Sequence, residues 1–155
     1  MVEQAVPGIP KQLVVFRVGP TAFGVDIAAV QEILPLLPVT RTPGAPAGVL
    51  GLADVRNKVI PVFDLHLHFG LTRPNDSRET RLIVVDAGAA PVAVLVDGVD
   101  QVVNVDPADI QPARGQGSVS APAYVNGVLR TADRLVLWVE PEALIPEPVQ
   151  MAAAA

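Results

Sequence analysis

Residues 48–70, GVLGLADVRNKVIPVFDLHLHFG, carry the clearest structural signal in the chain. Two apolar segments, 49–55 and 59–63, are rich in β-branched residues and flank the polar triplet RNK at 56–58. Two such segments around a short turn that contains Asn predict a β-hairpin.

The residue types at the end of this hairpin predict its local geometry. Alternation along the first strand turns Asp54 and Arg56 away from the buried face, which places a charge pair at the tip. Asn57 is expected to have a positive φ, because asparagine enters the left-handed region more easily than other non-glycine residues. Pro61 has no N–H to donate, so its strand is expected to be an edge strand or to bulge there.

The composition indicates a β-rich domain with a sizeable core. Of 155 residues, 50% are hydrophobic, 17% are charged and only 4% are aromatic, and the abundance of valine favours strands. The absence of cysteine excludes disulfides and thiolate metal sites, and a net charge of −5 argues against binding to nucleic acid. The N-terminus has no signal-peptide pattern and no apolar segment is long enough to span a bilayer, so we expect a cytoplasmic protein.

The rest of the chain is expected to form short strands joined by Gly, Pro and Asn turns. The predicted strands are 12–18, 22–26, 81–86, 92–97, 101–105 and the hairpin 124–129 with 134–139. Residues 27–34 have apolar residues at helical spacing and predict one or two helical turns before Pro35. Residues 106–123 are expected to be a long surface loop, and Pro141 is expected to begin a short helix. The pattern predicts a compact all-β barrel or sandwich.

Four segments resemble the CheW domains of bacterial chemotaxis, in the order in which that family has them. GLADVRNKVIPVFDLHLHFG (51–70) is similar to the family pattern G-V-I-N-L-R-G-x-I-V-P-V-I-D-L-R-x-x-F-G without a gap. FGVDIAAVQEI (23–33), VLVDGVDQVV (94–103) and YVNGVLRTADRLVLWVEPEALI (124–145) are similar to three further blocks of the family.

The resemblance implies two small SH3-like, five-stranded β-barrels packed together in one domain over residues 12–145, with a groove between them. The two intertwined subdomains are expected at about 12–70 and 80–140, with flexible tails at 1–11 and 146–155. It implies a chemosensory adaptor that is not an enzyme and needs no cofactor or metal. Its expected partners are the signalling tip of a chemoreceptor, the regulatory domain of the histidine kinase CheA, and other CheW-like domains in rings.

The resemblance also implies which residues bind the receptor. Arg56 matches an arginine that lies in the family's receptor groove, and Gly51 matches a glycine at which backbone can approach a partner closely. Val30 and Glu32 match the V-x-E-I positions near the same surface. These four residues are the predicted receptor-binding set.

Kinase binding is expected to involve residues 36–43 and the hairpin 124–139, without individual residues being assigned.

The chain departs from the family pattern at Ala53-Asp54 and at Asn57, where the family has Ile/Thr-Asn and Gly. The added aspartate lies beside Arg56 and is expected to neutralise part of its charge. A divergent relative that binds only one partner, or that serves a motility pathway other than flagellar taxis, is an alternative.

An alternative from another class is a metal-dependent barrel enzyme. On an extended strand Asp64, His66 and His68 share one face, and such a trio is able to bind Zn²⁺. In a turn of helix the three side chains diverge, and the family pattern has Arg in place of His66. A protease related to the aspartic proteases is disfavoured, since Asp86-Ala87-Gly88 lacks the hydroxyl residue of their catalytic loop.

Overall fold

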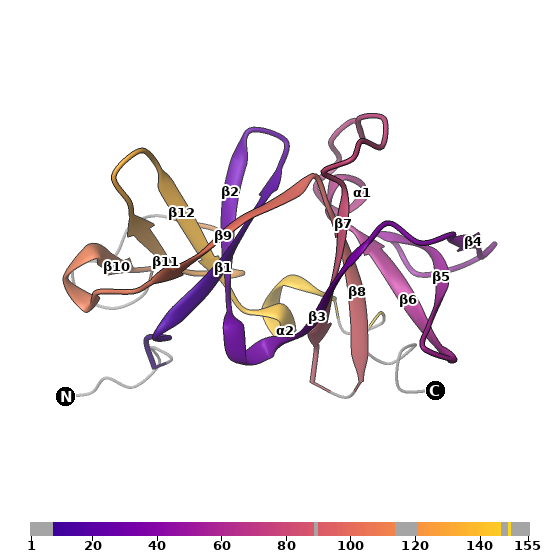
Figure 1. The fold of residues 1–155 in the computed structure, drawn as a ribbon, viewed down its shortest axis with the longest axis horizontal. Coiled ribbons are helices and arrows are strands. Elements are labelled where there is room, and N and C mark those ends of the chain that lie inside the picture. Colours follow the sequence, from indigo (N-terminus) through magenta and orange to yellow (C-terminus); the bar gives the residue numbers. More distant parts are fainter. Residues whose placement is uncertain (1–7, 89, 114–120, 147–148, 150–155) are drawn as a thin grey trace.

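The computed structural model describes residues 8–88, 90–113, 121–146 and 149, and within them twelve strands form two six-stranded sheets. The first sheet has the order β10-β11-β12-β2-β1-β9, and the second has the order β3-β7-β8-β6-β5-β4. Figure 1 shows the two sheets side by side. The all-β prediction is confirmed, and the very short strands β4 and β10 bring each sheet to six strands instead of five.

The strands of the first sheet are β1 (Gln12–Val18), β2 (Thr21–Asp26), β9 (Gly98–Asn104), β10 (Ile110–Pro112), β11 (Val125–Arg130) and β12 (Leu135–Val139). Those of the second sheet are β3 (Val30–Pro35), β4 (Thr40–Arg41), β5 (Val49–Val55), β6 (Lys58–Asp64), β7 (Arg81–Asp86) and β8 (Pro91–Val96). The helical segments are η1 (Ile27–Ala29), α1 (Leu65–Phe69), η2 (Pro107–Asp109) and α2 (Pro141–Leu144).

The two sheets are not divided at the polar loop 71–80, where the sequence interpretation placed the boundary between subdomains. The first sheet combines the hairpin β1–β2 with four strands from the C-terminal half, and β12 pairs with β2 in parallel. The chain therefore passes into the second sheet after β2 and returns to the first after β8. This division depends on pairing between distant strands, which local sequence patterns do not specify.

The predicted helix over 27–34 is wrong beyond its first three residues. Asp26 caps η1, its Oδ1 accepting a hydrogen bond from the Ala28 N–H at 2.9 Å, and the chain then continues as β3, which pairs with β7. Val30 and Leu34 satisfy a strand pattern as well as a helical one, because both lie on the half-buried face of β3. The apolar spacing alone did not distinguish the two structures.

The hairpin of β5 and β6 is confirmed, and its turn has φ of 53° at Arg56 and 66° at Asn57. The prediction that β6 is an edge strand is wrong, because β6 lies between β5 and β8. The alternative of a bulge at Pro61 is also wrong, because Pro61 pairs regularly with Leu52. Pro61 is tolerated because the ladder to β8 begins one residue later, at Val62. The expected loop 106–123 contains η2 and β10, and its residues 114–120 lie outside the described ones.

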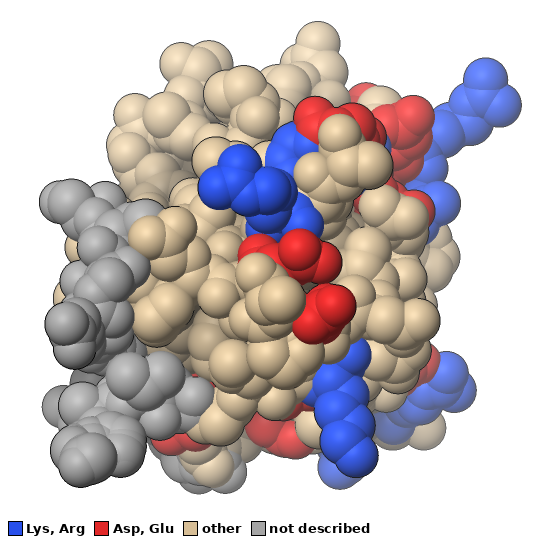
Figure 2. All heavy atoms as spheres, turned by 90° about the vertical axis from the view of Figure 1, so that its left-hand side faces the viewer, with Lys and Arg blue, Asp and Glu red and all other residues tan. Residues whose placement is uncertain are grey.

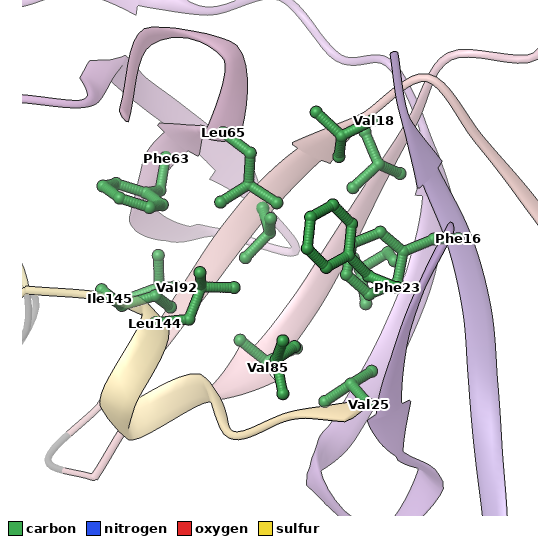
Figure 3. Packing of buried hydrophobic residues seen from close by; sticks show 14 of the residues in the cluster. Phe16, Val18, Phe23, Val25, Phe63, Leu65, Val85, Val92, Leu144 and Ile145 are labelled. Carbon is green, nitrogen blue, oxygen red and sulfur yellow. The ribbon is translucent and has the colours of Figure 1, made fainter. Parts of the chain in front are cut away.

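The main core lies between the two sheets. The residues of this central cluster that are labelled in Figure 3 are Phe16, Val18, Phe23, Val25, Phe63, Leu65, Val85, Val92, Leu144 and Ile145. Both sheets and the end of α2 therefore contribute to one apolar interior. Val149 is also fully buried in this cluster, so the C-terminal tail expected from 146 does not begin there. Residues 1–7, most of the expected N-terminal tail, lie outside the described ones.

Candidate functional site

The turn between β5 and β6 presents Arg56 at an exposed tip. Positive φ at both central residues matches the twist of the flanking strands, as in the tight turns of β-hairpins. Asp54 Oδ1 accepts a hydrogen bond from the Asn57 N–H at 2.9 Å and thereby closes the turn. The expected neutralisation of Arg56 by Asp54 is not observed, because the carboxylate of Asp54 is directed to the backbone.

Arg56 instead forms a forked ion pair with Glu32 on β3. Its Nε donates to Oε1 at 3.1 Å and to Oε2 at 2.9 Å, and its Nη2 also donates to Oε2. The Arg56 side chain is 76% exposed and that of Glu32 is 24% exposed. Charge-assisted bonds of this geometry fix the orientation of both groups. The structure thus brings together two of the four predicted receptor-binding residues, from strands that are not neighbours in the sheet.

This contact changes the acidity of the Glu32 carboxyl. Hydrogen bonds from Arg56 hold the Glu32 pKa below its usual range. The pair therefore contributes at pH values above the ordinary glutamate pKa of about 4.3, and the contribution is lost as the pH falls through the lowered value.

We expect the substitution Arg56→Ala to raise the Glu32 pKa towards that ordinary value, because the hydrogen bonds that stabilise its ionised form are removed. Carboxyl ¹³C NMR titrations of the parent and the variant measure this change directly. A Glu32 midpoint that is the same in both proteins contradicts the forked pair.

Val30 and Gly51 occupy different environments from this pair. Val30 is half-buried at the start of β3 and packs against the central cluster. Gly51 is buried in β5, and a Cβ atom added there would lie 2.1 Å from the backbone oxygen of Thr40 in β4. The close backbone approach that the sequence interpretation assigned to a partner is therefore made by the chain's own β4.

The two segments predicted to bind the kinase lie in opposite halves of the molecule, β4 at one end and the hairpin of β11 and β12 towards the other (Figure 1). Leu36, Leu37 and Val39 cover the cluster of the second sheet and line a surface hollow of about 250 Å³. The hairpin of β11 and β12 borders a hollow of about 650 Å³, beside which Leu135 is 54% exposed. Figure 2 shows uncharged residues over much of the described surface at this end, with Lys or Arg and Asp or Glu side chains across its middle.

The proposed metal trio does not converge. Asp64 caps α1, and its Oδ1 accepts a hydrogen bond from the His66 N–H at 2.8 Å. The His66 ring contacts both Asp64 and Asp97. The His68 ring lies 5.1 Å from the ring centroids of both Phe63 and Phe69. No group of three potential ligands among the described residues is placed to hold a metal ion. The turn of helix keeps His66 in contact with Asp64 and places the His68 ring against Phe63 and Phe69 instead.

Comparisons with known proteins show which family the chain resembles. A family model described as the CheW-like domain matches residues 12–149. The chemotaxis protein CheW of Rhizobium meliloti is 34% identical over 143 residues, which is 92% of each chain. That of Klebsiella aerogenes is 28% identical over 137 residues, 88% of this chain and 82% of the other.

A solved structure also resembles most of the molecule. The scaffolding protein TtCheW from Thermoanaerobacter tengcongensis superimposes with a TM-score of 0.74 at 30% identity, covering 84% of this chain and 89% of that one. Among the described residues, no helix has the length and apolar character to cross a membrane.

Proposed function

The chain belongs to the CheW-like domain family, and we propose that it couples the cytoplasmic tips of chemoreceptors to the histidine kinase CheA. Membership makes it a scaffold of chemotaxis and not an enzyme. The proposed mechanism is the simultaneous binding of two partners on separate surfaces, so that a change in the receptor biases the kinase. The proposed place of action is the cytoplasm, where both partner surfaces are exposed.

The forked pair of Arg56 and Glu32 is the observation that supports this proposal most strongly. The bonds to Glu32 use the Nε–H and one N–H of Nη2, which leaves both N–H donors of Nη1 and the second N–H of Nη2 for a partner. The guanidinium is held in one orientation and is still largely exposed. Such a group is suited to hydrogen bonding with carboxylates or backbone carbonyls of a receptor helix.

Titrations against each partner test the coupling role. The protein is mixed with a soluble helical hairpin of the receptor tip, with the isolated regulatory domain of the kinase, and with both together. We expect binding in each two-component titration and a ternary complex in the third. Binding to one partner alone identifies a protein that does not couple, and binding to neither contradicts the proposal.

We expect the kinase contact to depend only weakly on salt, because the hollow beside β11 and β12 is largely apolar. The substitution Leu135→Asp should weaken kinase binding by about tenfold or more, since a charge would replace an exposed apolar side chain in the predicted interface. Leu71→Asp is the matched control, because Leu71 is also exposed, at 46%, but lies outside the predicted region. Steep salt dependence, or equal effects of the two variants, contradicts this assignment.

A further inference from the structure

His66 is a buried histidine placed between two carboxylates. Its side chain is 2% exposed, with Nδ1 3.1 Å from Asp64 Oδ1 and Nε2 3.0 Å from Asp97 Oδ2. An ionised carboxylate only accepts hydrogen bonds, and a neutral imidazole has a single N–H. Both contacts are hydrogen bonds only when the ring carries both protons. The arrangement therefore fits an imidazolium better than either neutral tautomer.

The other charged groups around the ring do not remove the need for a proton on each ring nitrogen. Arg73 Nε lies 3.1 Å from Asp64 Oδ2, as an ion pair without hydrogen-bond geometry, and the guanidinium is shared with Asp76. The cluster thus holds three carboxylates and one arginine, and a protonated His66 is its second cation. A buried carboxylate that faces a lone pair instead of a donor is costly.

The cluster lies where the chain crosses between the sheets. Asp97 follows β8 of the second sheet and precedes β9 of the first, near α1 (Figure 1). Its Oδ2 also accepts a hydrogen bond at 2.7 Å from Gly19 N–H, in the turn between β1 and β2. His66, on α1 after β6, therefore connects the second sheet to the crossover and to a turn of the first sheet.

We propose that His66 is a proton-operated joint between the two sheets. When both ring nitrogens are protonated, His66 donates hydrogen bonds to Asp64 and Asp97 and so holds α1 against the crossover. Loss of the Nε2 proton removes the hydrogen bond to Asp97 and so loosens the connection between α1 and the crossover. Histidine is the side chain whose charge changes most readily with pH, so the strength of this connection is expected to depend on pH. This property goes beyond the proposed coupling role and does not depend on it.

Thermal unfolding between pH 6 and pH 9 tests the joint. The stabilisation is present while the ring is protonated and is lost as the pH rises, so we expect the Tm of the parent to fall by about 2–6 °C. His66→Gln should have a lower Tm at pH 6 and lack this fall. His68→Gln, the control, should retain it, because His68 makes no contact with Asp97 and burial lowers its pKa.

NMR on the parent protein tests the same proposal without a variant. We expect ¹⁵N shifts of the His66 ring to indicate two N–H groups at pH 6, and the Gly19 amide proton to shift as the ring loses a proton. A single neutral tautomer at pH 6 overturns the proposal. So does a fall in Tm that is the same in the parent and in His66→Gln.

Discussion

Replacing Phe63 with alanine is expected to lower the free energy of unfolding by about 3–5 kcal/mol, the usual range for truncating a buried phenylalanine. Phe63 is 0% exposed and lies in the central cluster between the sheets (Figure 3). Its ring also fills the space beside Gly48, where an added Cβ would lie 2.5 Å from Cε1. The backbone there is tied by a hydrogen bond from Asp64 N–H to the Gly48 oxygen at 2.8 Å, so the cavity cannot easily collapse.

Urea denaturation monitored by the fluorescence of Trp138 measures this effect, because Trp138 is the single tryptophan and is buried in the first sheet. Val59→Ala is the matched control, since Val59 lies on the same strand but is 68% exposed. Val59→Ala should change the free energy of unfolding by no more than about 0.5 kcal/mol. If Phe63→Ala lowers the free energy of unfolding by less than about 1 kcal/mol, the central role of this ring in the core is contradicted.

The same experiment shows whether the sheets unfold together. Phe63 belongs to the second sheet and Trp138 to the first. A shared core predicts that the fluorescence transition moves with the transition seen by circular dichroism. If only the circular dichroism transition moved, the two sheets would be separate cooperative units.

Features determined by neighbouring residues were predicted correctly. The hairpin follows from two β-branched segments around a polar turn, and the positive φ of Asn57 follows from the residue type. The helical turn ahead of Gly70 was one of two structures considered for the segment from Asp64, and it is the one observed, with Asp64 as its cap and Gly70 at φ 72°. In each case the interactions that select the structure lie within a few residues.

Features determined by distant residues were not predictable. Arg56 was expected to interact with Asp54 two residues away, whereas its partner Glu32 is 24 residues away and on another strand. His66 and Asp97 are separated by 31 residues, and their contact depends on the crossover between the sheets. The need for glycine at position 51 is likewise set by β4. These contacts exist only once the topology is known.

The second large effect is expected in receptor binding. Arg56→Ala should weaken binding of the receptor tip by about 1–3 kcal/mol, or about 5- to 150-fold, which is the range for hydrogen bonds to charged groups and includes the cost of leaving Glu32 unpaired. Because Arg56 is 76% exposed, stability should change by no more than about 0.5 kcal/mol. Kinase binding should persist, since the predicted kinase segments lie elsewhere. Arg78→Ala, which removes another exposed arginine, is the matched control and should leave receptor binding unchanged.

Two further variants separate a direct role of Arg56 from one that acts through Glu32. Arg56→Lys keeps the charge but cannot form the fork, so it should recover only part of the lost affinity. If Arg56 contacts the receptor itself, Glu32→Gln should cost less than Arg56→Ala, because the guanidinium remains and loses only its orientation. If Arg56→Ala and Glu32→Gln lose the same receptor affinity, and the variant with both changes loses no more than either, the two residues act as one unit. Unchanged binding in Arg56→Ala would make Arg56 an ordinary exposed turn residue and remove the receptor surface assigned to it.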